Sequence, residues 1–148
     1  DQHGIRQGGI EGKVNDNMVY HNGVDMNNTW DGIFIAGGAD RTTVNGNTCY
    51  SDGVRQRHGI FLADGAIDCT VNGNICYQNA SDGIQLEANN DYCSLIGNRC
   101  EGNGGWGINN LAATSDKCII LGNGLLGNTT GALQDNGTAT DAAHNMVV

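Results

Sequence analysis

The chain has 148 residues, and its 16 Asp and Glu against 7 Lys and Arg give a formal net charge of −9. Nucleic acids and anionic membrane surfaces both require a basic footprint, so the composition excludes them as partners. No run of 18 apolar residues is present for a membrane-spanning helix, and 24 Gly with no Pro indicate a chain rich in turns.

One asparagine organises the chain, because it recurs at intervals of 30, 27, 24, 25 and 22 residues. In every unit an apolar residue lies three positions before it and another lies two positions after it. The marker residues are Asn17, Asn47, Asn74, Asn98, Asn123 and Asn145. A drifting period with constant flanking positions is typical of a solenoid, in which each repeat packs on its neighbours.

Taken in chain order, the repeats give a partial first coil, four full coils and a shortened last coil. Alternation of apolar and polar residues predicts three short strands in each full coil, with Gly, Asn and Asp at the corners. The coils are a segment ending at Asn22, then Asp31–Asp52, His58–Asn79, Asp82–Asn103, Trp106–Asn128 and Leu133–Val148. The prediction is an all-β, single-stranded parallel β-helix of about six coils in one domain, residues 1–148.

The six Cys residues fall into two columns. Cys69, Cys93 and Cys118 each lie five residues before a marker Asn, and Cys49, Cys76 and Cys100 each lie two residues after one. These positions alternate in phase with Val, Leu and Ile, which favours stacked thiols in the core over disulfides or a metal site. Because no C-x-x-C spacing is present, we predict no metal site from the cysteines.

Two recurring blocks resemble those of a known family. Asp31–Ile35 and Asp82–Leu86 begin with DGI, and Val44–Tyr50 and Val71–Tyr77 share the pattern V-N-G-N-x-C-Y. In these blocks the chain resembles the right-handed parallel β-helix proteins of the pectin-lyase-like superfamily, which include polysaccharide lyases, alginate epimerases and phage tailspikes. The resemblance covers nearly the whole chain, and it agrees with the right-handed crossover rule for parallel strands.

The resemblance implies a rigid module for glycan recognition or adhesion in a tailspike, fibre or cell-surface protein, located outside the cell or on a virion surface. The alternative is an enzyme that degrades or modifies a polysaccharide, as a lyase, hydrolase or epimerase. Paired Asp-Asp and Arg-Ile-Lys elements, which mark the hydrolases of the superfamily, are absent. Because Ile5 and Val14 are already in phase, we expect the chain to be the C-terminal part of a longer protein, with an upstream domain or a second copy as its protein partner.

Two coils carry extra residues at one corner, in Gly23–Trp30 and Gly53–Arg57. Insertions in a solenoid emerge as loops, which often form the binding face. With the outward positions of the next strand, they give the predicted polysaccharide-binding residues: Trp30, Phe34, Arg55, Arg57, Phe61, Gln85, Trp106 and Asn109. The alternative is that both Phe side chains pack under the first loop or against a neighbouring subunit.

The position before the strand glycine forms a column of Asp31, His58, Asp82 and Trp106. The rung spacing predicts His58 about 5 Å from each carboxylate and the two carboxylates about 10 Å apart. Asp31, His58 and Asp82 are therefore the candidate catalytic residues, either as the separated carboxylates of an inverting glycosidase or with His58 as the proton acceptor of a lyase or epimerase. Ordinary turn chemistry, in which Asp precedes Gly, explains the same column.

Three further columns are visible, and none predicts a resident cofactor. Asp40, Asp68, Asp91 and Asp116 would suit Ca²⁺, but their irregular spacing favours capping turns. Tyr20, Tyr50 and Tyr77 form an outward ladder that would stiffen the sheet or contact a subunit. A corner column comprises Asn22, Asp52, Asn79, Asn103 and Asn128, and we assign no role to His3, His21 and His144.

Overall fold

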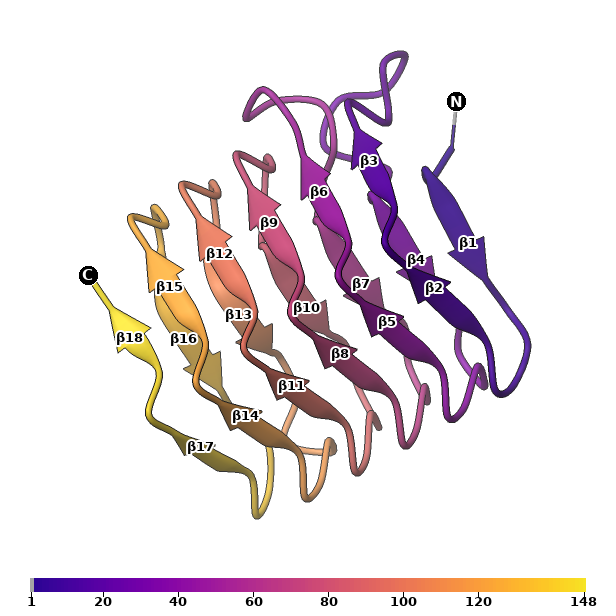
Figure 1. The fold of residues 1–148 in the computed structure, drawn as a ribbon, viewed down its shortest axis with the longest axis vertical. Helices are drawn as coiled ribbons and strands as arrows, with labels where there is room; N and C mark the ends of the chain where they lie inside the picture. The colour runs from indigo at the N-terminus through magenta and orange to yellow at the C-terminus, as the bar shows by residue number, and fades with distance from the viewer. Residues whose placement is uncertain (1) are drawn as a thin grey trace.

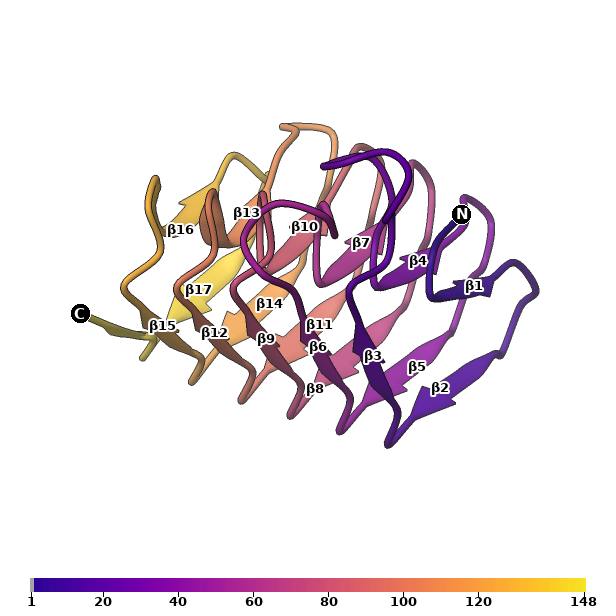
Figure 2. The ribbon, with the colours of Figure 1, turned by 90° about the horizontal axis from the view of Figure 1, so that it is seen from above.

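The computed structural model describes residues 2–148 and shows a right-handed parallel β-helix of about six coils, as predicted (Figure 1). Each coil contributes one strand to each of three six-stranded sheets, and all strand pairs are parallel. The sheets wrap around one axis, and the two chain ends lie at opposite ends of it (Figure 2). Residues 2–148 form no helix, so this part of the chain contains none that is long and apolar enough to cross a membrane.

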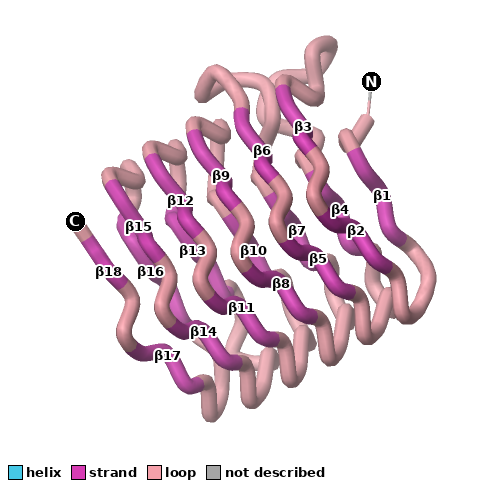
Figure 3. The backbone as a smooth tube through the Cα atoms, in the orientation of Figure 1, coloured by secondary structure: helices cyan, strands magenta, loops and turns pink. Residues whose placement is uncertain are grey.

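The tube in Figure 3 shows how short the strands are relative to the corners. Sheet A contains β1 (Ile5–Gln7), β4 (Ile33–Ile35), β7 (Ile60–Leu62), β10 (Ile84–Leu86), β13 (Trp106–Asn110) and β16 (Gly131–Asp135). Sheet B contains β2 (Lys13–Asn15), β5 (Thr43–Asn45), β8 (Thr70–Asn72), β11 (Ser94–Ile96), β14 (Ile119–Leu121) and β17 (Asp141–Ala143). Sheet C contains β3 (Met18–Tyr20), β6 (Thr48–Tyr50), β9 (Ile75–Tyr77), β12 (Arg99–Glu101), β15 (Gly124–Leu126) and β18 (Met146–Val147).

Side-chain alternation sets which residues enter the core. Except in the last coil, the strands of sheets B and C bury their central residue, such as Val44 and Cys49, and turn the flanking residues outward. Sheet A has the opposite phase, so β4 buries Ile33 and Ile35 and points Phe34 outward. Each fully buried Ile or Leu contributes about 1.5–3 kcal/mol relative to an exposed one, and no single coil can bury its own apolar residues.

The marker asparagines form a continuous ladder inside the corner between sheets B and C. Asn74, which is 0% exposed, donates from Nδ2 to Val44 O at 2.8 Å and to Asn98 Oδ1 at 3.0 Å. Its Oδ1 accepts bonds from Asn47 N and Asn47 Nδ2, both at 2.9 Å. Each rung repeats this pattern, which explains why the asparagine recurs while the coil length drifts.

The strand glycine of sheet A is required by close packing. A Cβ on Gly59 would lie 2.7 Å from Gly83 O and 2.8 Å from Cys76 Sγ. The equivalent Gly83 has the same problem with Gly107 O and Cys100. A side chain at this position would therefore separate two neighbouring coils.

The cysteines are stacked core thiols, as predicted. All six are free and buried, and Cys49, Cys76 and Cys100 are direct register partners. In the other column each Sγ donates to a carbonyl one coil back, as Cys93 does to Ala66 O at 3.3 Å. The thiols thus fill the core as small apolar groups.

The predicted corner column is wrong at one position, that of Asp52. Asp52 does not join the ladder, because its Oδ1 accepts from the backbone N–H groups of Val54 and Arg55 and begins a loop. Gln56 takes its place: it is 0% exposed, accepts from Asn22 Nδ2 and donates to Asn79 Oδ1, both at 2.7 Å. The longer Gln side chain fills the ladder position after the inserted residues.

The predicted aspartate column is also wrong at one member. Asp91 Oδ1 accepts from Asp116 N at 2.9 Å, so these two residues are stacked capping groups. Asp68 instead has φ of 56° and shares the left-handed position of Arg41 and Tyr92. It lies one position out of register, so the four carboxylates do not form one file.

The tyrosine ladder is stacked as the sequence predicts. Ring centroids are 5.3 Å apart for Tyr20 and Tyr50 and 4.8 Å apart for Tyr50 and Tyr77, with interplanar angles of 13° and 2°. The rings therefore cover one another's faces and stiffen sheet C.

Candidate functional site

The outer face of sheet A carries the predicted file of side chains in register. Phe34 pairs with Phe61, Phe61 with Gln85, and Gln85 with Asn109. Gln134 continues the file, and Arg6, which the sequence interpretation did not select, precedes it. Phe34, Phe61, Gln85 and Asn109 therefore lie on one face of sheet A, as the sequence predicts.

The two Phe side chains act as supports for cations rather than as an open platform. Phe61 is only 6% exposed, because the Arg57 guanidinium lies 4.8 Å from its ring centroid and His58 stacks on it at 5.4 Å. Phe61 therefore lies at an outward position, as predicted, but Arg57 and His58 cover it, and neither of them belongs to the first loop. Phe34 is half-buried, stacked on His3 at 4.3 Å and covered by the Arg6 guanidinium at 5.7 Å.

The two long corner loops hold each other in place beside this face, where they project above β3 and β6 in Figure 1. Asn28 N donates to Arg55 O and Arg57 N donates to Trp30 O, both at 2.8 Å. The Arg55 side chain turns back to Asp52, with Nη1 2.7 Å from Oδ2. Trp30 is half-buried and meets the His3 ring edge-on at 5.0 Å. Of the two loop arginines, only Arg57 reaches the file.

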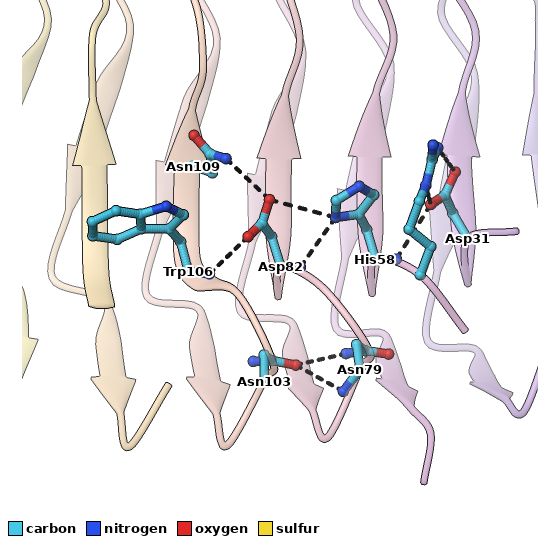
Figure 4. A network of polar contacts seen from close by, with 8 residues as sticks. Asp31, His58, Asn79, Asp82, Asn103, Trp106 and Asn109 are labelled. Atoms are coloured by element: carbon cyan, nitrogen blue, oxygen red, sulfur yellow. Dashed lines mark hydrogen bonds and ion pairs between the residues drawn. The ribbon is translucent and has the colours of Figure 1, made fainter. Parts of the chain in front are cut away.

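The predicted catalytic column is a ladder between side chains and backbone (Figure 4). Each side chain accepts a hydrogen bond from the backbone N–H of the equivalent residue on the next coil. The distances are 3.3 Å from His58 N to Asp31 Oδ1, 3.1 Å from Asp82 N to His58 Nδ1 and 2.7 Å from Trp106 N to Asp82 Oδ1. The structure therefore brings Asp31, His58, Asp82 and Trp106 together as the register predicts.

His3 belongs to this ladder and was missed. Asp31 N donates to His3 Nδ1 at 3.1 Å, and the same nitrogen lies 3.2 Å from Asp31 Oδ2. The signal was present in the sequence, because His3-Gly4-Ile5 repeats the triplet that begins at His58.

Asp31 is a buried carboxylate with a full set of partners. Its side chain is 0% exposed and forms a bidentate pair with Arg57, in which Nε and Nη2 each lie 2.9 Å from an oxygen. Burial by itself raises the pKa of Asp31, but the two hydrogen bonds that the charged Arg57 guanidinium donates outweigh that effect and hold the pKa below its usual value. Asp31 is therefore ionised at neutral pH and fixes Arg57 above Phe61.

His58 is neutral in this environment. Burial of the imidazole lowers its pKa to about 4, although the nearby carboxylates of Asp31 and Asp82 act in the opposite direction. Since Nδ1 accepts the Asp82 N–H, the proton of the neutral ring is on Nε2. His58 therefore offers a hydrogen-bond donor and has no free nitrogen that accepts a proton.

Both carboxylate oxygens of Asp82 also accept hydrogen bonds. It is 4% exposed, its Oδ1 accepts from Trp106 N, and its Oδ2 accepts from Asn109 Nδ2 at 3.0 Å. Gln85 is half-buried beside it on the file, and the half-buried Trp106 ring lies against Gly131. The arrangement can donate hydrogen bonds, and Arg6 adds a positive charge at its edge, whereas the charge of Arg57 is paired with Asp31. The acceptor atoms of Asp31, His58 and Asp82 all accept hydrogen bonds already.

A model of one protein family, described as "Periplasmic copper-binding protein (NosD)", matches residues 3–145. Among solved structures, the periplasmic alginate epimerase AlgG is similar, with a TM-score of 0.69 and 18% identity over 91% of this chain and 39% of that one. A point mutant of AlgG gives a TM-score of 0.73 and 17% identity over 97% of this chain and 42% of that one.

These structures share the fold, and the chain spans less than half of their length. A search of curated proteins found no match. The β-helix predicted from the repeats and from the resemblance is thus confirmed by the family match and by the solved structures.

Proposed function

Since the chain belongs to the NosD family of β-helix proteins, we propose that it is an exported module that binds an acidic polysaccharide on the outer face of sheet A and does not cleave it. The observation that carries this proposal is that two guanidinium groups lie on this face while the candidate acid–base residues already accept hydrogen bonds. Arg6 and Arg57 lie over Phe34 and Phe61, whereas the acceptor atoms of Asp31, His58 and Asp82 are all engaged.

The charge distribution supports an anionic ligand. The chain carries a net charge of −9, yet two of its few cations stand on adjacent parts of one face. Arg6 can bind a ligand carboxylate with two parallel bonds while it lies over Phe34. Arg57 already uses Nε and Nη2 on Asp31 and can offer only its remaining N–H groups. Gln85 and Gln134 continue the file with amide groups that suit sugar hydroxyls.

The named relatives are periplasmic and one of them modifies alginate, which supports an exported location and a polysaccharide partner. Nothing in these relatives supports a virion surface or a tailspike. Glycan adhesion by a fibre and binding to a second copy of the chain stay predictions.

Copper, which the family description names, does not fit residues 2–148. These residues contain no group of three or more His, Cys, Asp and Glu side chains placed to hold a metal ion. The thiols are core groups that are at most 1% exposed, and His58 Nδ1 already accepts a backbone N–H. We therefore assign copper no role in the function proposed for this face.

The test compares binding with turnover. Purified protein is titrated with polygalacturonate, alginate and a neutral glucan by calorimetry, while ultraviolet absorbance and reducing ends report cleavage. We expect binding of the two acidic polymers only, and Arg6→Gln to weaken it about tenfold, the value of one charge-assisted hydrogen bond. Arg41→Gln is the matched control, because Arg41 pairs with Glu11 on a different part of the surface.

Absence of binding to both acidic polymers would refute the proposal. Turnover that disappears in His58→Ala would instead establish the second candidate, an enzyme that uses Asp31, His58 and Asp82. The similarity to an epimerase fold is the observation that keeps this candidate under test.

A further inference from the structure

The outer face of sheet A changes in character along its length. The half formed by β1, β4 and β7 carries the two guanidinium groups over their Phe rings. On β10 and β13 the same file continues with two amides, Gln85 and Asn109, and Trp106 stands beside them. We call Gln85, Trp106 and Asn109 the amide surface.

The amide surface carries no cationic side chain. Beyond β7 the chain contains only two cationic residues: Arg99 lies on β12 in sheet C, and Lys117 pairs with Asp116 before β14. The carboxylates of Asp82 and Glu87, by contrast, flank β10. A polymer with a carboxylate on every sugar would therefore bring like charges together here, with no cation to pair them.

The amides of this surface have unused hydrogen-bonding capacity. Gln85 is half-buried, and its side chain makes no hydrogen bond within residues 2–148, so it offers donors and an acceptor to a ligand. Asn109 is the register partner of Gln85 and donates from Nδ2 to Asp82, but no residue in this part of the chain donates to its buried Oδ1. A buried acceptor without a partner is costly, and a donor hydroxyl from a ligand would remove that cost.

Trp106 supplies the aromatic part of the amide surface. Its half-buried ring extends from β13 towards β16 (Figure 4), and a Cβ on Gly131 of β16 would overlap the ring atoms. Glycine at this position therefore makes room for the ring. An aromatic ring next to amides suits the C–H faces and the hydroxyl groups of a neutral sugar.

We propose that the ligand is an acidic heteropolysaccharide, with a uronate at Arg6 and neutral sugars along the amide surface. This inference rests on the polysaccharide binding proposed above and adds the composition of the polymer. Arg6 and Asn109 are four strand spacings apart in sheet A, roughly 19 Å, so a fragment of several sugars reaches from one to the other. Sugar hydroxyls can both accept from the Gln85 amide and donate to Asn109 Oδ1, whereas an ionised carboxylate only accepts.

The test compares two fragments of about five sugars, the length of this stretch, by calorimetry. Oligogalacturonate carries a carboxylate on every sugar, whereas a fragment of deacylated gellan has single glucuronates separated by neutral sugars. We expect the gellan fragment to bind about tenfold more tightly, which one or two additional net hydrogen bonds provide. Gln85→Ala should remove this advantage. Gln78→Ala is the matched control, because Gln78 is exposed directly after β9 in sheet C, and it should keep the advantage.

Gln85→Lys makes the opposite change, because it adds a cation to the amide surface. It should strengthen the binding of oligogalacturonate and reverse the order of the two fragments. Equal affinities in the unsubstituted protein, or an advantage that survives Gln85→Ala, would overturn this inference and leave the binding of acidic polysaccharide in place. Absence of binding to both fragments would refute the proposed function, and this inference with it.

Discussion

Replacement of Asn74 by Ala tests whether the buried ladder holds the coils together. Asn72 offers a matched control, because it has the same side chain two residues earlier but faces outward on sheet B. Asn74 makes four side-chain hydrogen bonds at 0% exposure. Asn72 is half-buried, and its Oδ1 accepts one bond, from Ile96 N at 3.0 Å.

The expected magnitudes follow from these contacts. At about 1 kcal/mol for each net hydrogen bond, loss of the Asn74 side chain costs roughly 4 kcal/mol. The cost is not relieved by solvent, because Asn47 N and Val44 O lose partners in a buried place. Asn72→Ala should cost less than about 1 kcal/mol, since water replaces the single lost bond.

Urea titrations followed by far-UV circular dichroism measure both free energies of unfolding, with the slope checked for unchanged exposure on unfolding. A domain of ordinary stability has about 5–15 kcal/mol, so the Asn74 variant should remain folded but unfold at much lower urea. If the two variants differ by less than about 1 kcal/mol, the ladder is not a principal support of the coil stack.

Three further outcomes are expected. His58 has a pKa of about 4 in the folded protein and about 6.5 when unfolded, so its contribution to the free energy of unfolding is present above pH 6.5 and is lost as the pH falls towards 4. Urea titrations should show a loss of roughly 3 kcal/mol over this range, and His58→Asn should reduce this dependence of stability on pH. Gly59→Ala, whose Cβ meets Gly83 O, should cost about 3 kcal/mol by the same titrations, whereas Gly65→Ala, at φ of 79° in open space, should cost about 1–2 kcal/mol. A chromogenic thiol reagent should react with none of the six cysteines in the folded protein and with all six in urea.

The fold was predictable because the same side-chain roles recur at every coil. The marker asparagines, the strand glycines and the thiol columns each satisfy a contact with the coils above and below, so their periodicity records the register directly. Asn74 and Asn98 could thus be placed as neighbours from their spacing alone, and the structure confirms the pairing.

Prediction failed where one coil departs from its neighbours. Gln56 fills an asparagine position after an insertion, and only its extra methylene allows it to reach the ladder. Asp68 directly precedes a cysteine, whereas Asp91 lies two residues before one, which moves Asp68 to a left-handed position. The burial of Phe61 depends on Arg57 folding over it, which no periodicity reveals.

The proposed polysaccharide-binding face begins at Arg6 on β1, the first strand of sheet A, and Asp135 lies on β16, the last. In a solenoid each coil contacts only its neighbours, so a change in one coil has little energetic effect several coils away. Arg6 and Asp135 lie five strands apart in sheet A, which corresponds to roughly 24 Å at the strand spacing. The double variant Arg6→Gln with Asp135→Asn should therefore show the polysaccharide affinity of Arg6→Gln alone, within about 0.5 kcal/mol by calorimetry. A polysaccharide affinity that Asp135→Asn changes by more than this would mean that the ends of the helix communicate, which nearest-neighbour packing does not predict.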